Sequence, residues 1–260
     1  MAFVEIDTVT HAYAGNAGTP AVEGLTLSIA EGEFAAVVGP SGCGKSTLMK
    51  LVTGLQSPGH GTVRVGGVVV RGPLKIAGMA FQAPNLLPWR TTLENILLPL
   101  EIVEPHRRLM RSRRSEYIGK AEALLAQVGL KDISGKFPWE LSGGMQQRAS
   151  LCRALIHEPA LLMLDEPFGA LDSFTREELW CVMRDLHAAR PVTIILVTHD
   201  LREAAFLADR IFCMSARPGR IITERGVDFP RPRSLELTYT PEFTDLVHQL
   251  RGQIASARQA

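Results

Sequence analysis

A glycine-rich stretch that contains a lysine can bind phosphate groups. It spans residues 39–47, follows an apolar run over residues 34–38 and precedes a helix-prone segment. Backbone N–H groups of such a loop, together with the N-terminus of the next helix, attract phosphate oxygens. Lys45 can reach β- and γ-phosphates, and the Ser46 hydroxyl can hold Mg²⁺. The candidate phosphate-binding residues are Gly39, Pro40, Ser41, Gly42, Cys43, Gly44, Lys45, Ser46 and Thr47.

Two carboxylates follow a second apolar run. Residues 161–164 are Leu-Leu-Met-Leu, and Asp165 and Glu166 come directly after them. The carboxyl ends of strands line the ligand crevice of an open α/β sheet. Asp165 is a candidate to hold the Mg²⁺ of a bound nucleotide, and Glu166 a candidate to deprotonate an attacking water. The alternative is a pair of helix-capping residues, but the phosphate loop itself requires a carboxylate that binds metal.

Two further strand ends carry polar side chains. Gln82 follows residues 78–81, and His199 follows the apolar run at 191–198. An imidazole at that edge can hydrogen-bond a γ-phosphate and the attacking water, whereas Gln82 alone is compatible with an ordinary polar strand end. We interpret the six other histidines as surface or packing residues: His11, His60, His106, His157, His187 and His248.

A second helix start has the composition of an anion site. Residues 141–148 read Leu-Ser-Gly-Gly-Met-Gln-Gln-Arg, in which Ser142 can cap the helix. Gly143 and Gly144 then fall in the first helical turn, where glycine disfavours the helix. Capping explains Ser142 alone, but it does not explain the two glycines. Exposed backbone N–H groups for an anion explain all three residues.

The elements that must position these residues can be outlined from periodicity. A strand over residues 3–10, a turn at 15–18 and a returning strand at 21–29 are expected, with Tyr13 near the mouth of the phosphate loop. There Tyr13 either stacks on an adenine or simply packs. The other expected elements are a hairpin at 62–70, helices over 85–140 with an amphipathic stripe at 107–130, two strands around a Pro-Gly turn at 210–223, an extended stretch at 228–233 and a closing helix from 241.

Composition and charge narrow the class of protein. The 260 residues carry a formal net charge of +1, so nothing in the overall balance calls for nucleic acid as a partner. The four cysteines are scattered, which fits a reducing cytosol. Cys43, beside Lys45, is either a thiolate-prone thiol or an inert filler position. The arginines at 107, 108, 111, 113 and 114 form a solvated face or contact anionic lipid. No signal peptide or membrane span is expected.

In this order, the motifs at 39–47, 82, 141–148, 161–167, 172 and 199 resemble the ATP-binding subunits of ABC transporters. The resemblance covers nearly the whole chain, and the signature at 141–148 is its most specific part. Residues 86–100, 215–221 and 228–233 are similar to the ATPases of bacterial nitrate, aliphatic sulfonate and taurine importers.

The resemblance implies an α/β fold, a P-loop NTPase core of mainly parallel sheet flanked by helices, with an antiparallel β layer and an inserted α-helical subdomain. The first part of the ATP-binding core is expected at 1–84 and the helical subdomain with the signature at 85–150. The second part of the core is expected at 151–225, and a C-terminal extension with an amphipathic helix at 226–260.

The resemblance also implies a role for each matching residue. ATP and Mg²⁺ bind between the phosphate loop of one subunit and Ser142, Gly143 and Gly144 of a second copy, in a head-to-tail dimer. Catalysis is assigned to Glu166 as general base, with His199, Gln82 and Lys45, and the metal to Ser46, Gln82 and Asp165. Tyr13 stacks on adenine, and Asp172 couples the two sites.

The implied partners are a second copy, an integral membrane permease and, indirectly, an extracytoplasmic solute-binding protein, at the cytoplasmic face of the inner membrane. Residues 87–90 are candidates for the wall of the groove that receives the permease, or they form a packed helix cap. One alternative is a soluble ABC-type ATPase that acts on nucleic acid or ribosomes, which usually has paired cassettes or a long coiled-coil insertion. Another is a nucleotide-binding subunit without hydrolysis, which is disfavoured because Glu166 and His199 are both present.

Overall fold

The structure is a computed structural model that describes residues 2–13, 19–169, 171–190 and 192–256. The chain divides into two compact units: residues 1–74 together with 183–260 form the first, and residues 75–182 form the second. The turn expected at 15–18 lies outside the described residues. Among the helices described, none combines the length and the apolar character that crossing a bilayer requires.

One sheet of the first unit is antiparallel, with the strand order β2-β1-β4-β5. Its strands are β1 (Ala2–His11), β2 (Val22–Ala30), β4 (His60–Val65) and β5 (Val68–Val69). Buried and exposed residues alternate along β2, as expected for a strand with one face on a core. The expected returning strand and the expected hairpin at 62–70 are confirmed by the pairing of β1 with β2 and of β4 with β5.

The other strands of the first unit are β3 (Phe34–Val38), β8 (Thr193–Thr198), β9 (Arg210–Met214) and β10 (Ile221–Gly226). β3 pairs in parallel with both β8 and β9, and β10 pairs antiparallel with β9. Every residue of β3 and β8 is buried, which explains why both read as continuous apolar runs. The two strands expected around a Pro-Gly turn are β9 and β10.

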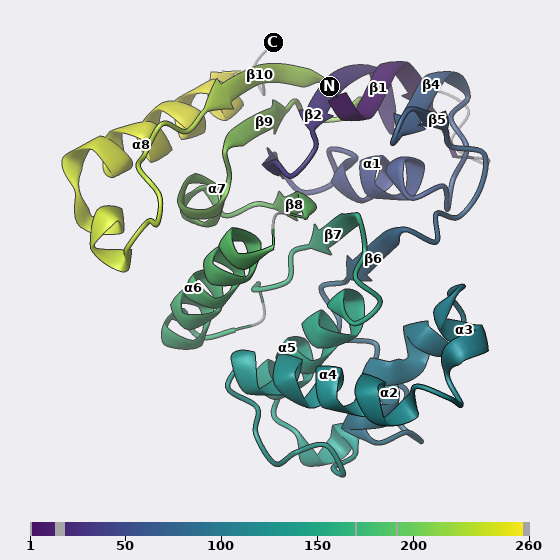
Figure 1. The fold of residues 1–260 in the computed structure, drawn as a ribbon. Helices are drawn as coiled ribbons and strands as arrows, with labels where there is room; N and C mark the ends of the chain where they lie inside the picture. Colours follow the sequence, from purple (N-terminus) through teal and green to yellow (C-terminus); the bar gives the residue numbers. More distant parts are fainter. Residues whose placement is uncertain (1, 14–18, 170, 191, 257–260) are drawn as a thin grey trace. The chain divides into compact units, whose positions relative to one another are not determined.

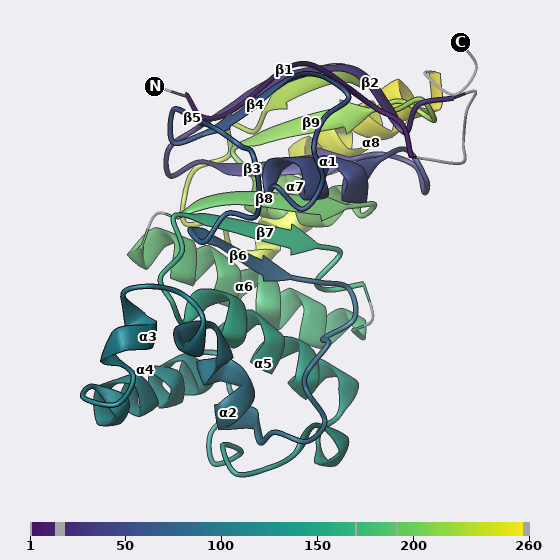
Figure 2. The ribbon, with the colours of Figure 1, turned by 90° about the vertical axis from the view of Figure 1, so that its right-hand side faces the viewer.

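The helices of the first unit lie on both faces of these strands (Figure 1). They include α1 (Lys45–Val52), α7 (Leu201–Leu207), the 3-10 helix η3 (Leu235–Tyr239) and α8 (Pro241–Ser256). α1 contacts β4 and β8, whereas α7 contacts β3 and α8, on the side away from α1 (Figures 1 and 2). The closing helix begins as expected, because the Thr240 hydroxyl accepts a hydrogen bond from the Phe243 N–H at 3.3 Å.

The second unit pairs β6 (Ala77–Ala80) in parallel with β7 (Leu161–Asp165). Its helices are α2 (Thr92–Leu97), η1 (Leu98–Glu101), α3 (His106–Leu109), α4 (Arg114–Gln127), η2 (Pro138–Glu140), α5 (Gly143–Leu155) and the first part of α6 (Ser173–Ala189). The stripe expected over 107–130 is divided between α3 and α4 by a turn at 110–113. Arginines at helical spacing in this stretch repel one another, which disfavours one continuous helix.

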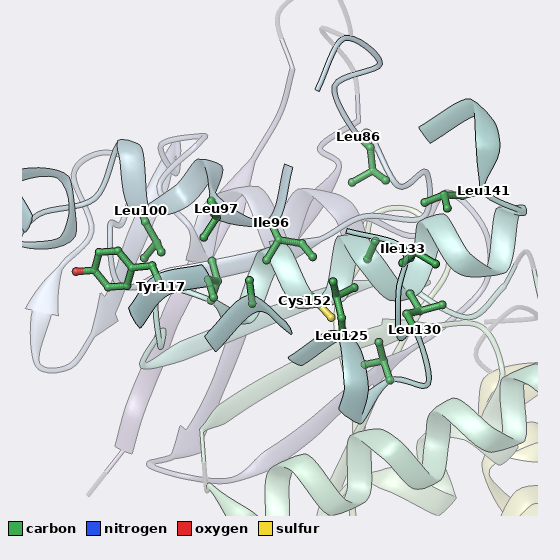
Figure 3. Close-up of a cluster of buried hydrophobic side chains, with 14 residues drawn as sticks. Leu86, Ile96, Leu97, Leu100, Tyr117, Leu125, Leu130, Ile133, Leu141 and Cys152 are labelled. Carbon is green, nitrogen blue, oxygen red and sulfur yellow. The ribbon is translucent and has the colours of Figure 1, made fainter. Parts of the chain in front are cut away.

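A single apolar cluster holds the helices of the second unit together (Figure 3). Ile96 of α2, Tyr117 and Leu125 of α4, and Cys152 of α5 are at most 1% exposed within it. Burial of such side chains contributes roughly 1.5–3 kcal/mol each. The cluster therefore fixes the start of α5, where the Ser-Gly-Gly signature lies, relative to α2 and α4.

Candidate functional site

The phosphate loop connects β3, which ends at Val38, with α1, which begins at Lys45. Gly42 and Gly44 adopt φ angles of 76° and 99°, a left-handed conformation that favours glycine. The loop can therefore turn sharply between the strand and the helix. The expected strand–loop–helix arrangement is confirmed.

Lys45 lies within this loop rather than in solvent. Lys45 is only 6% exposed. Its Nζ donates to the carbonyl oxygens of Gly39 at 2.8 Å and Pro40 at 3.0 Å. Ser46 follows on the exposed side of the first turn of α1. An ammonium group and a hydroxyl at a helix N-terminus can both meet the oxygens of a polyphosphate.

A segment distant in sequence supports the loop from behind. A Cβ atom added to Gly219 would lie 2.0 Å from the Cys43 carbonyl oxygen, and one added to Gly44 would lie 2.5 Å from Val22 Cγ1. Gly219 also exchanges backbone hydrogen bonds with residues 21 and 23. The sequence indicated only a turn at Gly219, because its contact with the phosphate loop depends on the pairing of β9 with β3.

Of the two alternatives for Cys43, the structure favours the inert position over the thiolate-prone one. Cys43 is fully buried, and burial raises the pKa of its thiol above the ordinary value although Lys45 acts in the opposite direction. Desolvation of the buried thiol outweighs the effect of the nearby Lys45 ammonium group. Cys43 can therefore contribute its backbone to the loop but not a reactive sulfur.

Tyr13 and His199 lie near the phosphate loop in the first unit. Tyr13 Oη is 3.2 Å from Thr47 Oγ1, which confirms the expected position near the loop. His199 is exposed and directly follows β8, whose Thr198 is in register with Val38 at the end of β3. The phosphate loop and His199 thus leave neighbouring parallel strands at the same edge. Of the histidines interpreted as surface or packing residues, His11, His157 and His187 are buried.

Two predicted residues of the second unit are in direct contact. Gln82 follows β6 and Glu166 follows β7, and Gln82 Nε2 donates to Glu166 Oε2 at 3.3 Å. Parallel pairing of Ala80 with Leu164 brings the two strand ends together. Asp165 is the last residue of β7, and Glu166 has a φ angle of 47°, which is uncommon for a residue with a side chain.

The N-terminus of α5 lies beside the start of α6. Ser142 accepts a hydrogen bond from the Met145 N–H at 3.3 Å, as expected for a cap. A Cβ atom on Gly144 would lie 3.3 Å from Leu171 Cδ2, whereas one on Gly143 would meet nothing within 4 Å. Packing within the chain therefore explains why position 144 is a glycine. Packing against the described residues does not explain the glycine at position 143.

Asp172 directly precedes α6 and has an exposed carboxylate. The backbone N–H of Thr175 donates to Asp172 Oδ1 at 3.1 Å, and this hydrogen bond lowers the pKa of the Asp172 carboxyl below its ordinary value. An ionised carboxylate at a helix N-terminus is also favoured by the helix dipole. The residue thus stays charged at neutral pH.

Two residues that the sequence did not single out fix the segment around Gln82. Gln147 of α5 donates through Nε2 to the Phe81 carbonyl at 2.9 Å, and Arg153 donates to the carbonyls of Pro84 at 2.7 Å and Asn85 at 2.8 Å. Both side chains lie on the helix that begins with the signature. The sequence offered a signal only for Gln147, which is the second glutamine of the Met-Gln-Gln-Arg run at 145–148.

Comparison with known proteins gives the class of this chain. The family model described as ABC transporter matches residues 22–169. The taurine import ATP-binding protein TauB of Chromobacterium violaceum is 40% identical, over 100% of this chain and 98% of that protein. The aliphatic sulfonates import ATP-binding protein SsuB of Bacillus licheniformis is 43% identical over 85% of this chain and 82% of that protein, and TauB of Escherichia coli K12 is 35% identical over 97% and 98%.

Two solved structures share the fold. The dimeric structure of MJ0796, a bacterial ABC transporter cassette, has a TM-score of 0.73 at 30% identity and covers 87% of this chain and 100% of its own. A post-hydrolysis state of the same cassette with ADP and Pi has a TM-score of 0.72 at 31% identity, with the same coverage. The chain belongs to the ABC transporter family, and it is an ATP-binding, ATP-hydrolysing subunit of that family. The relatives favour the importer interpretation over the nucleic-acid alternative.

Proposed function

We propose that this chain energises a bacterial importer for taurine, an aliphatic sulfonate, nitrate or a related small solute, by binding and hydrolysing ATP at the cytoplasmic face of the membrane. The observation that carries the proposal is the grouping of polar residues at strand ends. The phosphate loop and His199 follow β3 and β8, whereas Gln82 and Glu166 follow β6 and β7 and are in contact.

We assign these residues to the binding and hydrolysis of ATP. Lys45 binds the β- and γ-phosphates, and Glu166 accepts the proton of the attacking water. Gln82 orients that water together with Glu166, and His199 hydrogen-bonds the γ-phosphate. Tyr13, whose hydroxyl reaches Thr47, stacks on the adenine.

The donor set fits Mg²⁺. The described residues contain no group of three or more His, Cys, Asp or Glu that could hold a metal by themselves. Mg²⁺ prefers oxygen ligands and is usually bound by one or two protein oxygens together with substrate phosphates. The Ser46 hydroxyl, the Gln82 amide oxygen and the Asp165 carboxylate are donors of this kind. When bound, Mg²⁺ neutralises charge on the phosphate oxygens.

We propose that a second copy of the chain completes the site. Ser142, Gly143 and Gly144 of the second copy offer backbone N–H groups to the γ-phosphate, and Asp172 couples the two sites. The open space around a Cβ of Gly143 supports this proposal, because packing within the described chain does not require glycine there. A ligand that approaches the helix start from outside does require it.

The permease contact is proposed at residues 87–90. Trp89 is 71% exposed, so its indole is accessible to a partner protein. The buried Asn95 amide donates to the carbonyls of Leu87, Arg90 and Thr91 at 3.0–3.1 Å, so the backbone that presents Trp89 is held in place. A rigid aromatic anchor of this kind suits a protein interface.

The proposal is tested by mild-detergent purification of the tagged chain from its native membranes, followed by mass spectrometry. We expect a polytopic membrane protein in equal or half stoichiometry, and its loss in Trp89→Ala with ATP hydrolysis by the isolated subunit retained. Tyr239→Ala is the matched control, because Tyr239 is 73% exposed and lies outside residues 87–90. Recovery of only soluble factors or nucleic acid would contradict the importer function.

The solute class is tested with the recovered complex in proteoliposomes. We expect uptake of taurine, an aliphatic sulfonate or nitrate that depends on ATP, on an added solute-binding protein and on Glu166. ATP-dependent uptake of an unrelated solute would refute the solute class while leaving the energy-coupling role in place.

A further inference from the structure

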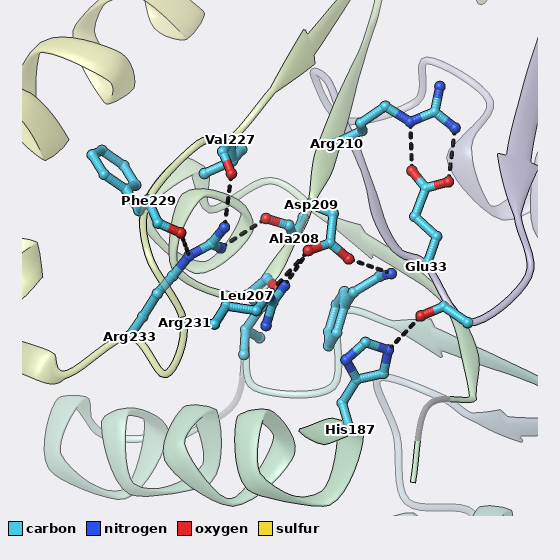
Figure 4. Close-up of polar contacts among 12 residues, drawn as sticks. Glu33, His187, Leu207, Ala208, Asp209, Arg210, Val227, Phe229, Arg231 and Arg233 are labelled. Atoms are coloured by element: carbon cyan, nitrogen blue, oxygen red, sulfur yellow. Dashed lines mark hydrogen bonds and ion pairs between the residues drawn. The ribbon is translucent and has the colours of Figure 1, made fainter. Parts of the chain in front are cut away.

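A fully buried arginine closes the C-terminal end of α7. Arg233, which follows β10, is 2% exposed. Its guanidinium donates to the carbonyl oxygens of Ala205 at 3.2 Å and Phe206 at 3.0 Å. It also donates to the Ala208 carbonyl oxygen at 2.7 Å (Figure 4). The last carbonyls of a helix lack partners within the helix, so Arg233 supplies donors to groups that otherwise need water or another cap.

The same guanidinium also binds its own segment. It donates to the Val227 carbonyl at 3.0 Å and to the Phe229 carbonyl at 3.5 Å. Burial lowers the pKa of Arg233 to about 10, so the side chain remains charged at neutral pH. A buried charge is tolerated only when hydrogen bonds replace its hydration. The planar fork of arginine can serve this many carbonyls, whereas a lysine ammonium has only three donors.

Arg231 connects the end of α7 to the strand that precedes the phosphate loop. It donates to Asp209 Oδ1 at 3.0 Å and 2.6 Å and to the Leu207 carbonyl at 2.9 Å. The other oxygen of Asp209 accepts a hydrogen bond from the backbone N–H of Phe34, the first residue of β3, at 2.9 Å. Arg231 and Arg233 together form a clamp on the end of α7 (Figure 4).

The opposite end of α7 begins directly after His199. Asp200 caps the helix by accepting hydrogen bonds from the N–H groups of Arg202 at 2.8 Å and Glu203 at 3.3 Å. α7 has only seven residues, so it is too short to be stable by itself and depends on its caps and packing. A loosened C-terminal end is therefore expected to loosen the N-terminal end, and with it the backbone of His199.

We propose that Arg231 and Arg233 are positioning residues for ATP hydrolysis, which act by holding α7 so that His199 keeps its place beside the phosphate loop. The inference rests on the proposed role of His199. The C-terminal extension is thereby part of the hydrolytic machinery of this chain rather than a separate appendage.

The first test measures the steady-state hydrolysis of ATP and the hydrogen exchange of the full-length protein. For Arg233→Lys, and for the milder Arg231→Gln, we expect kcat to fall about tenfold while KM for ATP changes less than about twofold. Exchange over residues 199–208 should rise in the same variants, and exchange in α1 should stay unchanged. Arg225→Lys, at an exposed arginine on β10, is the matched control and should leave both measurements unchanged.

The second test asks whether the effect passes through His199. In a double-mutant cycle with His199→Ala, the Arg233→Lys or Arg231→Gln change should have almost no further effect on kcat. An equal fold-loss in both backgrounds, or a lower melting temperature with unchanged kcat, would overturn the positioning role while sparing the proposed role of His199. A normal kcat for His199→Ala alone would instead contradict both.

Discussion

Gln82 Nε2 donates a hydrogen bond to Glu166 Oε2 at 3.3 Å, although 84 positions separate the two residues in the chain. The contact exists because β6 and β7 pair in parallel and end at the same edge. We proposed that Gln82 orients the attacking water and that Glu166 accepts its proton, so this hydrogen bond joins the two residues that act on the water. The amide is thus placed to fix the orientation of the carboxylate.

Removal of this amide is expected to slow hydrolysis without unfolding the protein. Gln82→Ala should lower kcat on the order of 10- to 100-fold, because Glu166 then lacks the donor that orients it. Gln82 is exposed, so the melting temperature should change little. The measurement is phosphate release at saturating ATP. A kcat equal to that of the unchanged protein would remove Gln82 from the site.

The outline of this site could be predicted from the sequence because its residues follow apolar strands. An apolar run ending in Asp165 and Glu166, or in His199, is readable locally, and parallel pairing brings such ends together. The phosphate loop was predicted for the same reason. Its glycines and lysine carry their conformational requirement in the sequence itself.

The supports of the site could not be predicted in the same way. Arg233 belongs to a residue type that is almost always exposed, and only the packing of residues 227–233 against α7 buries it. In the sequence, Gly219 looks like an ordinary turn glycine, because its contact with the phosphate loop depends on the pairing of β9 with β3. The sequence leaves the character of Cys43 open, because its neighbour Lys45 is visible there whereas the burial that dominates its pKa is not.

Gly143 offers a prediction in which stability and function change in opposite directions. Gly143→Ala should raise the free energy of unfolding by up to about 1 kcal/mol, because alanine favours the helix and nothing in the described chain blocks its Cβ. ATP hydrolysis should nevertheless fall if the second copy places its phosphate there. Chemical denaturation and ATPase assays on the same preparation test this. Full activity in Gly143→Ala would contradict the proposed contact.

Gly219 is expected to be essential for the shape of the phosphate loop. Gly219→Ala places a methyl group within 2.0 Å of the Cys43 carbonyl, so either the loop or residues 215–220 must move. We expect weaker binding of a fluorescent ATP analogue, by about tenfold or more, and a lower melting temperature. Gly72→Ala is the control in the same unit, since its Cβ meets nothing within 4 Å. Equal affinity in the two variants would refute this support role.

His187 should make the stability of the protein depend on pH. Its Nε2 is 2.9 Å from the Gly32 carbonyl, and burial lowers the pKa of His187 below the ordinary value (Figure 4). The unfolded chain therefore binds a proton near pH 6.5 that the folded chain binds only at lower pH. Stability from this group is complete above pH 6.5 and is lost as the pH falls, by at most about 1.4 kcal/mol per pH unit.

Replacement of His187 should remove the part of the pH dependence of stability that this histidine contributes. The free energy of unfolding of His187→Gln, measured by urea titration between pH 7.5 and pH 5, should decline less steeply than that of the unchanged protein. His248→Gln is the control, because His248 is exposed on α8. An identical decline in all three proteins would show that His187 does not titrate in this range.

In the proposed dimer, ATP joins the phosphate loop of one copy to the Ser142–Gly144 helix start of another. The most direct test is sedimentation of Glu166→Gln with ATP and Mg²⁺, because this change removes the general base but keeps the shape of the side chain. We predict a stable dimer with ATP, and monomers with ADP or when Lys45→Ala is added. Monomers of Glu166→Gln at saturating ATP and Mg²⁺ would contradict the shared site.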